Sequence, residues 1–248
     1  MAFTKLSLSY QGSVLSDSIA LRVSSLGQIS KPTSHANQSY SPLHSTTEGF
    51  KRLNIPTQRE THVLLRKYLR DITYTFHVIH GPTLTDMVDR LYLQLNQRGQ
   101  IQPGPATLLL SIIASVTHQW TRNDVIEYGL FSSPEAAGEQ NPAWVKASLD
   151  LADSSRRSGS LSLEHVQGLI IASSVVCGIE GFSQRYRSIF STAVMIAQEI
   201  GLHSVDRPIN EAVPGSDTLS GVEAEMRRRV WWFLTGSDWS VHAGVLNV

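Results

Sequence analysis

The chain has 248 residues, enough for one large domain or two small ones with a substantial apolar core. Its 21 Lys and Arg residues balance 21 Asp and Glu residues, which argues against an extended surface for a polyanion and restricts any DNA contact to a local one. The single cysteine, Cys177, excludes a disulfide framework within these residues and indicates a reducing compartment, and no apolar run reaches the roughly 20 residues of a bilayer-spanning helix, so we expect no membrane partner.

The first part of the chain differs in composition from the rest. Residues 1–54 are rich in Ser, Thr, Gln and Asn, sparse in charge and without sustained helical periodicity. Such a segment buries too little apolar surface to offset the entropy of ordering it. The sequence therefore predicts a disordered Ser/Thr-rich leader over 1–54 and a helical domain over 55–248. A transit peptide is an alternative interpretation of the Ser-rich, acid-poor start.

Order is expected to begin at Pro56. Thr57 and Glu60 have the spacing of a capping box, in which each side chain satisfies a free backbone N–H group at the start of a helix. Gly81-Pro82 marks the end of this helix. Between these points one apolar stripe recurs at helical spacing: Leu65, Tyr68, Leu69, Ile72, Phe76 and Ile79.

Two further helices follow on similar signals. Thr83 is expected to cap a helix with the apolar stripe of Leu84, Met87, Val88, Leu91 and Leu95. Gly104-Pro105 opens the next helix, because proline is tolerated at a first helical position. Asn141-Pro142 repeats this device, and the stretch 121–140 between them is predicted to be a loop with one short turn.

The last third of the chain contains the predicted core. From Ser162 to Ile179 apolar residues occupy almost every face, which indicates a central helix enclosed by others; a strand is the competing interpretation. The next helix follows Ser183, ends at Gly201 and packs antiparallel to the central one. A second capping box at Ser220–Glu223 starts a final helix. The predicted fold is all-α, an array of antiparallel helices.

Three separated segments carry a family resemblance. The first is His77-Val78-Ile79-His80-Gly81-Pro82-Thr83-Leu84, the second runs from Ser162 to Gly201-Leu202-His203, and the third is Glu225-Met226-Arg227-Arg228-Arg229-Val230-Trp231-Trp232. In this order they resemble the regulatory domain, or middle homology region, of fungal zinc-cluster transcription factors. The resemblance covers about 55–240 and gives these motif residues a structural or regulatory role: His80, Pro82, Thr83, Gly201, Leu202, His203, Glu225, Arg228, Trp231 and Trp232.

The chain departs from that family at several positions. Leu84 stands where the family has Phe, and Asp238 is followed by Trp239 where the family has Asp-Arg. Further helices normally complete the domain, so we expect it to be incomplete at the C-terminus. The family's zinc cluster uses six cysteines, and Cys177 alone cannot form it. Zinc binding and the reading of a DNA sequence are therefore not transferred to these residues, and no cofactor is expected in this chain.

The charged and histidine residues of the motifs have two interpretations each. Arg227, Arg228 and Arg229 could contact phosphate, but successive helical residues face different directions. The structural interpretation pairs Arg227 with Glu223 and Arg229 with Glu225, and places Arg228 over Trp231 or Trp232.

The histidines allow a similar choice. His77 and His80 could share a metal ion, but no third ligand is evident, so His80 is expected to form hydrogen bonds at a helix end. For His203 we expect a contact with the carbonyl-rich end of the preceding helix.

The function that follows from the resemblance is transcription regulation. No Gly-x-Ser-x-Gly, phosphate-loop, dinucleotide or His-Glu-x-x-His motif occurs, so no enzyme and no catalytic, cofactor-binding or metal-binding residue is predicted. The resemblance implies a nuclear regulator of RNA polymerase II transcription, for a metabolic or biosynthetic pathway. Its partners would be other regulators, a second copy in a homodimer or a small-molecule effector. Alternatives are a helical interaction protein that titrates a full-length regulator and an enzyme with an unrecognised helical pocket.

Overall fold

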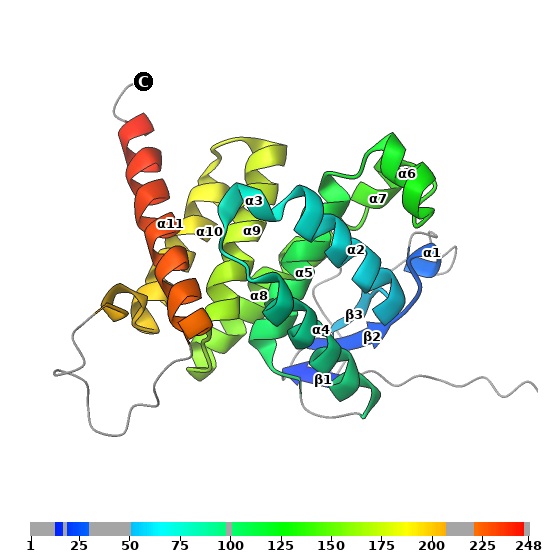
Figure 1. Cartoon of the computed structure of the whole chain (residues 1–248), viewed down its shortest axis with the longest axis horizontal. Coiled ribbons are helices and arrows are strands. Elements are labelled where there is room, and N and C mark those ends of the chain that lie inside the picture. The colour runs from blue at the N-terminus through cyan, green and yellow to red at the C-terminus, as the bar shows by residue number, and fades with distance from the viewer. Residues whose placement is uncertain (1–12, 17–18, 30–50, 98–100, 207–220, 246–248) are drawn as a thin grey trace, which may run out of the picture.

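The computed structural model describes residues 13–16, 19–29, 51–97, 101–206 and 221–245 (Figure 1). Helices dominate this part of the chain, which confirms the predicted all-α class. In chain order they are α1 (Leu26–Ile29), α2 (Gln58–Asp71), α3 (Thr73–Phe76), α4 (Gly81–Asn96), α5 (Pro103–His118), α6 (Arg122–Tyr128), α7 (Pro134–Gly138), α8 (Asn141–Ser158), α9 (Leu163–Glu180), α10 (Gln184–Glu199), the 3₁₀ helix η1 (Leu202–Ser204) and α11 (Gly221–Val245).

A small sheet lies at one edge of the helices, with strands β1 (Ser13–Ser16), β2 (Ile19–Val23) and β3 (Lys51–Ile55). β1 and β2 are antiparallel, and β2 and β3 are parallel. Here the structure differs from the expectation of a leader without regular structure over 1–54. Leu21, Leu26 and Leu53 are buried in the core, and their burial supplies the apolar contacts that the composition did not reveal. The other residues of that range lie outside the described part.

The first predicted helix is interrupted. The capping box of Thr57 and Glu60 starts α2 as expected, with both reciprocal hydrogen bonds present. α2 ends at Asp71, and a single turn, α3, follows it. His77 then adopts a left-handed conformation, with φ of 53°, which ends α3. The prediction of one helix up to Gly81-Pro82 was therefore wrong, although its apolar stripe is largely buried.

The start of α4 also differs from the prediction. Gly81 and Pro82 form the first turn of this helix, and His80 is its N-cap, with an extended backbone. Thr83 lies inside the first turn and is not the cap. The difference follows from the ability of proline to occupy the first helical turn, where its missing N–H group leaves no hydrogen bond unmade.

The predictions for the middle of the chain were correct at both ends and wrong between them. α5 begins at Pro103, one residue before the predicted Gly104-Pro105, and α8 begins at Asn141 as expected. The range 121–140, predicted as a loop, contains α6 and α7. Thr121 and Asp124 form a capping box at the start of α6, with hydrogen bonds of 2.7 Å and 3.3 Å between side chain and backbone.

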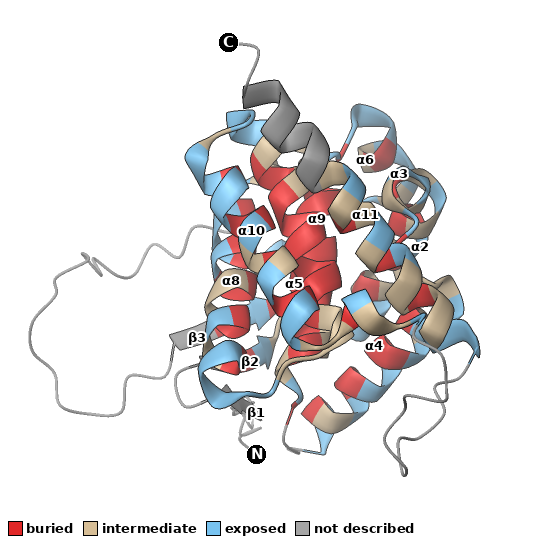
Figure 2. Cartoon of the chain, turned by 90° about the vertical axis from the view of Figure 1, so that its left-hand side faces the viewer, coloured by how far each residue is buried: buried red, intermediate tan, exposed pale blue. Residues whose placement is uncertain are grey.

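Helix α9 is the central element (Figure 2). α5, α8 and α10 surround it, and the strand interpretation was wrong. Among the described helices, α9 alone is long and apolar enough to cross a membrane by length and composition, but much of it is buried inside the domain, as in the core helix of a folded protein. A side chain at Gly168 would meet the backbone of Leu108, so this glycine allows α9 and α5 to approach closely.

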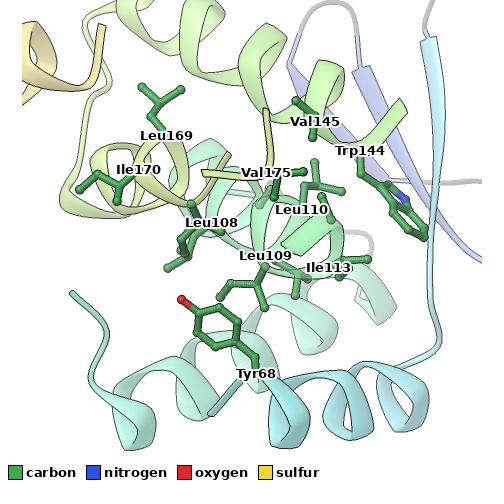
Figure 3. Packing of buried hydrophobic residues seen from close by; sticks show 14 of the residues in the cluster. Tyr68, Leu108, Leu109, Leu110, Ile113, Trp144, Val145, Leu169, Ile170 and Val175 are labelled. Carbon is green, nitrogen blue, oxygen red and sulfur yellow. The ribbon is translucent and has the colours of Figure 1, made fainter. Parts of the chain in front are cut away.

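The buried side chains form a continuous core between α2, α5, α8 and α9 (Figure 3). Tyr68 reaches from α2 toward Leu108 and Leu109 of α5. On the opposite side, Trp144 of α8 points toward the sheet and donates a hydrogen bond from Nε1 to the carbonyl oxygen of Asn54, at 3.3 Å. The sheet is thereby connected to the helical core.

A group of charged residues joins α2 to α6. The Lys67 ammonium is buried and lies 2.8 Å from Asp71 and 2.9 Å from Asp124. Burial alone would lower the pKa of Lys67, but the hydrogen bonds and charges of Asp71 and Asp124 outweigh it and raise the pKa. These contacts connect α2 to α6, and the loss of either carboxylate would leave the buried ammonium with less compensation for its charge.

The last helices lie close to where the sequence predicted them. α10 follows Ser183, whose hydroxyl accepts a hydrogen bond from the Tyr186 N–H group at 3.1 Å. Gly201 follows α10 in a left-handed conformation, with φ of 74°. A short connection joins α9 to α10, and the two helices pack side by side as the predicted antiparallel pair. α11 begins at Gly221; the predicted cap, Ser220, lies outside the described residues.

Candidate functional site

A cavity of about 480 Å³ lies between α4, the start of α9, the end of α10 and the start of α11. Its size is within the usual range for small-molecule sites. The apolar part of its wall includes Ile79, Leu84, Met87, Leu108, Ile200 and Met226. Hydroxyl, amide and charged groups complete the lining.

The three motif segments meet around this cavity. The first contributes His80 and Thr83, and the third contributes Met226 and Arg227. The second contributes Ser162, Leu163, Glu164, Gln167 and Ile200. These segments are far apart in the sequence, and the fold brings them to one place. Of the ten motif residues named from the sequence, His80 and Thr83 line the cavity.

His80 and Thr83 are hydrogen-bonded to each other. The imidazole Nδ1 lies 2.8 Å from the Thr83 hydroxyl oxygen, across the first turn of α4. Pro82, between them, occupies the first turn without needing a hydrogen-bond partner for its nitrogen. The His80 side chain thus lies at a helix end and forms a hydrogen bond there, and it forms part of the cavity wall.

At the start of α9, the cavity lining includes a capping arrangement that was not predicted from the sequence. Ser162 is the N-cap of α9, and the His165 Nδ1 accepts a hydrogen bond from its N–H group at 3.1 Å. Gly104 of α5 lies against this pair, and a Cβ there would collide with the Ser162 hydroxyl. The signal in the sequence was a Ser-x-x-His spacing, in which His takes the place of the usual Glu or Gln.

The electrostatic state of His165 follows from its position. Burial lowers the pKa of this imidazole to about 4, although the charge of Glu164 opposes the shift. His165 is therefore neutral at pH 7, and its Nδ1 remains an acceptor. Further along α9, the Gln167 amide donates a hydrogen bond to the Val78 carbonyl oxygen at 2.7 Å, which connects α9 to the segment before α4.

The Gly201-Leu202-His203 motif connects α10 to α11. Gly201 supplies the left-handed turn, and Leu202 is buried in the core. The ring of His203 lies 6.0 Å from that of Trp231, measured between centroids. The predicted contact of His203 with helix-end carbonyl groups is not among the contacts of this side chain; its ring faces an aromatic partner on α11.

The arginines of α11 form ion pairs. Arg227 lies 3.2 Å from Glu223, and Arg229 lies 2.8 Å from Glu225, which are the two predicted helical pairs. Arg228 does not lie over an indole ring as predicted. It contacts Glu225 at 2.6 Å and Asp206, just after η1, at 2.9 Å.

These contacts and the two tryptophans position α11. Hydrogen bonds from Arg229 and Arg228 lower the pKa of Glu225. Trp231 packs at the edge of the core, whereas Trp232 is 64% exposed. Phe233 contacts Phe76 of α3 edge to face, with centroids 5.5 Å apart. α11 is therefore held by rings and surface charges on its sides and by a narrow apolar stripe toward the core.

In the residues that the structure describes, no group of three or more His, Cys, Asp or Glu side chains has the geometry of a metal site. His77 and His80 in particular are not part of such a group. Cys177 is partly buried within α9.

Comparison with known proteins identifies the class. The family described as "Fungal specific transcription factor domain" matches residues 65–234, and the chain belongs to this family. No solved structure is significantly similar to the chain.

Several curated proteins are similar to the chain. The probable transcription factor lepB of Aspergillus flavus is 33% identical over 192 residues, which are 76% of this chain and 33% of that protein. The transcription factor TAS2 of Pyricularia oryzae is 24% identical over 184 residues, 73% of this chain and 23% of that protein. The agnestins biosynthesis cluster transcription factor AgnL11 of Paecilomyces divaricatus is 23% identical over 192 residues, 75% of this chain and 27% of that protein. The chain thus spans a third or less of the length of these relatives.

Proposed function

We propose that this chain acts as the regulatory region of a transcription regulator of the fungal zinc-cluster type. In this proposal it works in the nucleus and controls transcription by RNA polymerase II for a metabolic or biosynthetic pathway. The family match over 65–234 and the relatives named as transcription factors support it. One relative is named as the transcription factor of a biosynthesis cluster, which supports the pathway role.

The observation that carries the proposal is the meeting of the three motif segments at one cavity. A region of this kind regulates by responding to a ligand or to another protein and does not itself catalyse a reaction. The proposed partners are other transcription regulators, a second copy of the chain and a small-molecule effector. Neither zinc binding nor DNA reading is assigned to these 248 residues, which contain one cysteine.

The test is a comparison of transcripts after deletion and after overexpression of the coding sequence in its fungal host. We expect the transcripts of one set of pathway genes to change together and in opposite directions in the two strains. Val230→Asp, which places a charge at a fully buried position of α11, should remove the effect of overexpression. If neither strain altered any coordinated set of transcripts, the proposed regulatory role would be wrong.

A second candidate function is that of an interaction protein that titrates a full-length regulator. Its contacts would be exposed aromatic residues: Tyr74 on α3 is 67% exposed and Trp232 on α11 is 64% exposed. The helices that carry them are in contact through Phe76 and Phe233. Coexpression with a cysteine-containing relative distinguishes the two functions. Titration predicts that the chain is recovered with that relative and lowers its reporter output, and that Trp232→Ser weakens both effects.

A further inference from the structure

The cavity between α4, α9 and α11 has a lining that specifies the chemistry of an occupant. We propose that it binds a neutral, mainly apolar small molecule that carries hydroxyl or carbonyl oxygens. The role of this molecule as an effector rests on the proposed regulatory function, whereas its chemical class is inferred from the residues that line the cavity.

The charges of the lining cancel. Two arginines, Arg90 and Arg227, and two glutamates, Glu164 and Glu223, contribute to the wall. Arg227 and Glu223 neutralise each other at 3.2 Å. An anionic occupant would gain from Arg90 and lose to Glu164, and a cationic occupant would meet the reverse, so the wall favours neither sign.

The uncharged surface favours an apolar body. Leu84 and Met87 of α4 are buried, as is Met226 of α11, and all three line the cavity. Methionine side chains adapt their shape and make favourable contacts with aromatic rings. A cavity of about 480 Å³ lined in this way suits a molecule of one or a few rings.

The remaining polar groups explain why oxygens are expected on the occupant. Among the described residues Arg90 and Glu164 take part in no ion pair, although the Arg90 Nε donates to the Asp86 carbonyl oxygen at 3.3 Å. The guanidinium can donate a hydrogen bond to a carbonyl or hydroxyl oxygen, and the carboxylate can accept one from a hydroxyl group. Both interactions orient a neutral molecule without burying a net charge.

The position of α11 gives binding a consequence. This helix supplies Val222, Glu223, Met226 and Arg227, whereas α4 and α9 supply much of the opposite wall. An occupant therefore bridges α11 to the core of the domain. Because a ligand stabilises the arrangement that it binds, occupancy favours the docked position of α11 over any displaced one.

The experiment uses the purified 248-residue chain and Nile red, a neutral planar dye with a carbonyl oxygen. Binding is followed by the increase in dye fluorescence, and unfolding by circular dichroism. We expect saturable binding of one dye per chain. Val222→Trp places a larger ring at a lining residue that is 46% exposed, so the fold should persist, and we expect the dissociation constant to rise about tenfold.

The matched control is Leu93→Trp. Leu93 lies on α4, is 55% exposed and does not line the cavity, so this variant adds the same ring elsewhere on the surface. Its affinity for Nile red should equal that of the unmodified chain. Equal affinities in the two variants, or no saturable binding, would overturn the proposed site. Leu161→Trp, at a second lining residue, provides an independent check if Val222→Trp unfolds the chain.

Charged dyes test the class of occupant. Anilinonaphthalene sulfonate is anionic and thioflavin T is cationic. Each should displace Nile red less effectively than an uncharged, non-fluorescent analogue of Nile red does. Tighter competition by either dye, abolished by Val222→Trp, would show a charged ligand and contradict the neutral class. These measurements involve no transcription, so they are independent of the proposed function. If the chain bound Nile red but did not change transcripts, the proposed function would be wrong and the cavity would still be a binding site.

Discussion

The α5–α9 pair and the first part of α11 belong to the same matched region, but the pair and α11 are held in the domain by different forces. Most residues of α5 and α9 are buried, and Gly168 brings their backbones close together. α11 places Met226, Val230 and Leu234 toward the core, one residue per turn, and carries ion pairs on its sides. The inner pair is therefore a fixed support, whereas α11 is a peripheral helix whose position a ligand or partner can influence.

The largest loss of stability is expected from a cavity in the inner pair. Ile113 of α5 is fully buried, and Ile113→Ala should lower the free energy of unfolding by about 2–5 kcal/mol, because it removes buried methyl groups and leaves a void. Ile126→Ala on α6 is the matched control, since Ile126 is 84% exposed. It should change stability by less than about 0.5 kcal/mol. Chemical denaturation measures both, and equal losses would contradict the assignment of the core.

The inner pair also has a pH dependence. Because the pKa of His165 falls from 6.5 to about 4 on folding, the neutral imidazole is favoured in the folded state. The contribution of His165 to the free energy of unfolding is fully present above pH 6.5. As the pH falls toward 4, about 3 kcal/mol of it is lost. Unfolding curves between pH 7 and pH 4 measure this loss.

The matched variant for this pH dependence is His165→Gln. Gln at the third position of the helix can accept a hydrogen bond from the Ser162 N–H group, as the imidazole does, but it does not titrate. Its stability should therefore fall less steeply over the same pH range. A variant with the same pH slope as the unmodified chain would show that other groups cause the dependence.

A large-to-small change on α11 should cost less than the same change on α5. Leu234 is buried, and Leu234→Ala should lower the free energy of unfolding by about 2 kcal/mol, near the lower limit for such changes, because a peripheral helix can shift to close the void. Hydrogen exchange should accelerate more in α11 than in α5, because α5 exchanges through global unfolding whereas α11 can also open locally. A loss as large as that of Ile113→Ala would mean that α11 is part of the fixed support.

The sequence predicted the elements whose signals are local. Thr57 and Glu60, Asn141 and Pro142, and Ser183 all mark helix starts within a few residues, and the structure confirms each of them. α6 was missed because its capping box uses Asp124, which was not recognised as an alternative to Glu. The break at His77 was missed because the apolar stripe continues across it, so periodicity alone indicated one helix.

Features that depend on contacts between residues far apart in the chain could not be predicted from the sequence. β2 pairs with β3 across a long intervening segment, and neither strand has a turn signal that indicates its partner. Asp206 approaches Arg228 from beyond η1, so a prediction limited to neighbouring turns of α11 selected the indoles instead. The cavity was not predictable for the same reason. The motif residues can be recognised in the sequence, but packing decides that His80 and Thr83 line the cavity and that Trp232 does not.

The smallest effect on stability is expected from Arg228. This guanidinium and its partners Glu225 and Asp206 are solvent-exposed, so water and salt screen the ion pairs. Arg228→Ala should leave the midpoint of unfolding indistinguishable from that of the unmodified chain, while amide exchange in residues 222–234 becomes faster by about threefold or less. Arg185→Ala, which removes an exposed ion pair with Glu180 at the junction of α9 and α10, should leave exchange in α11 unchanged. If Arg228→Ala lowered the midpoint as far as Leu234→Ala does, surface charge rather than the apolar stripe would hold α11 in place, and the contrast between the two regions would have to be redrawn.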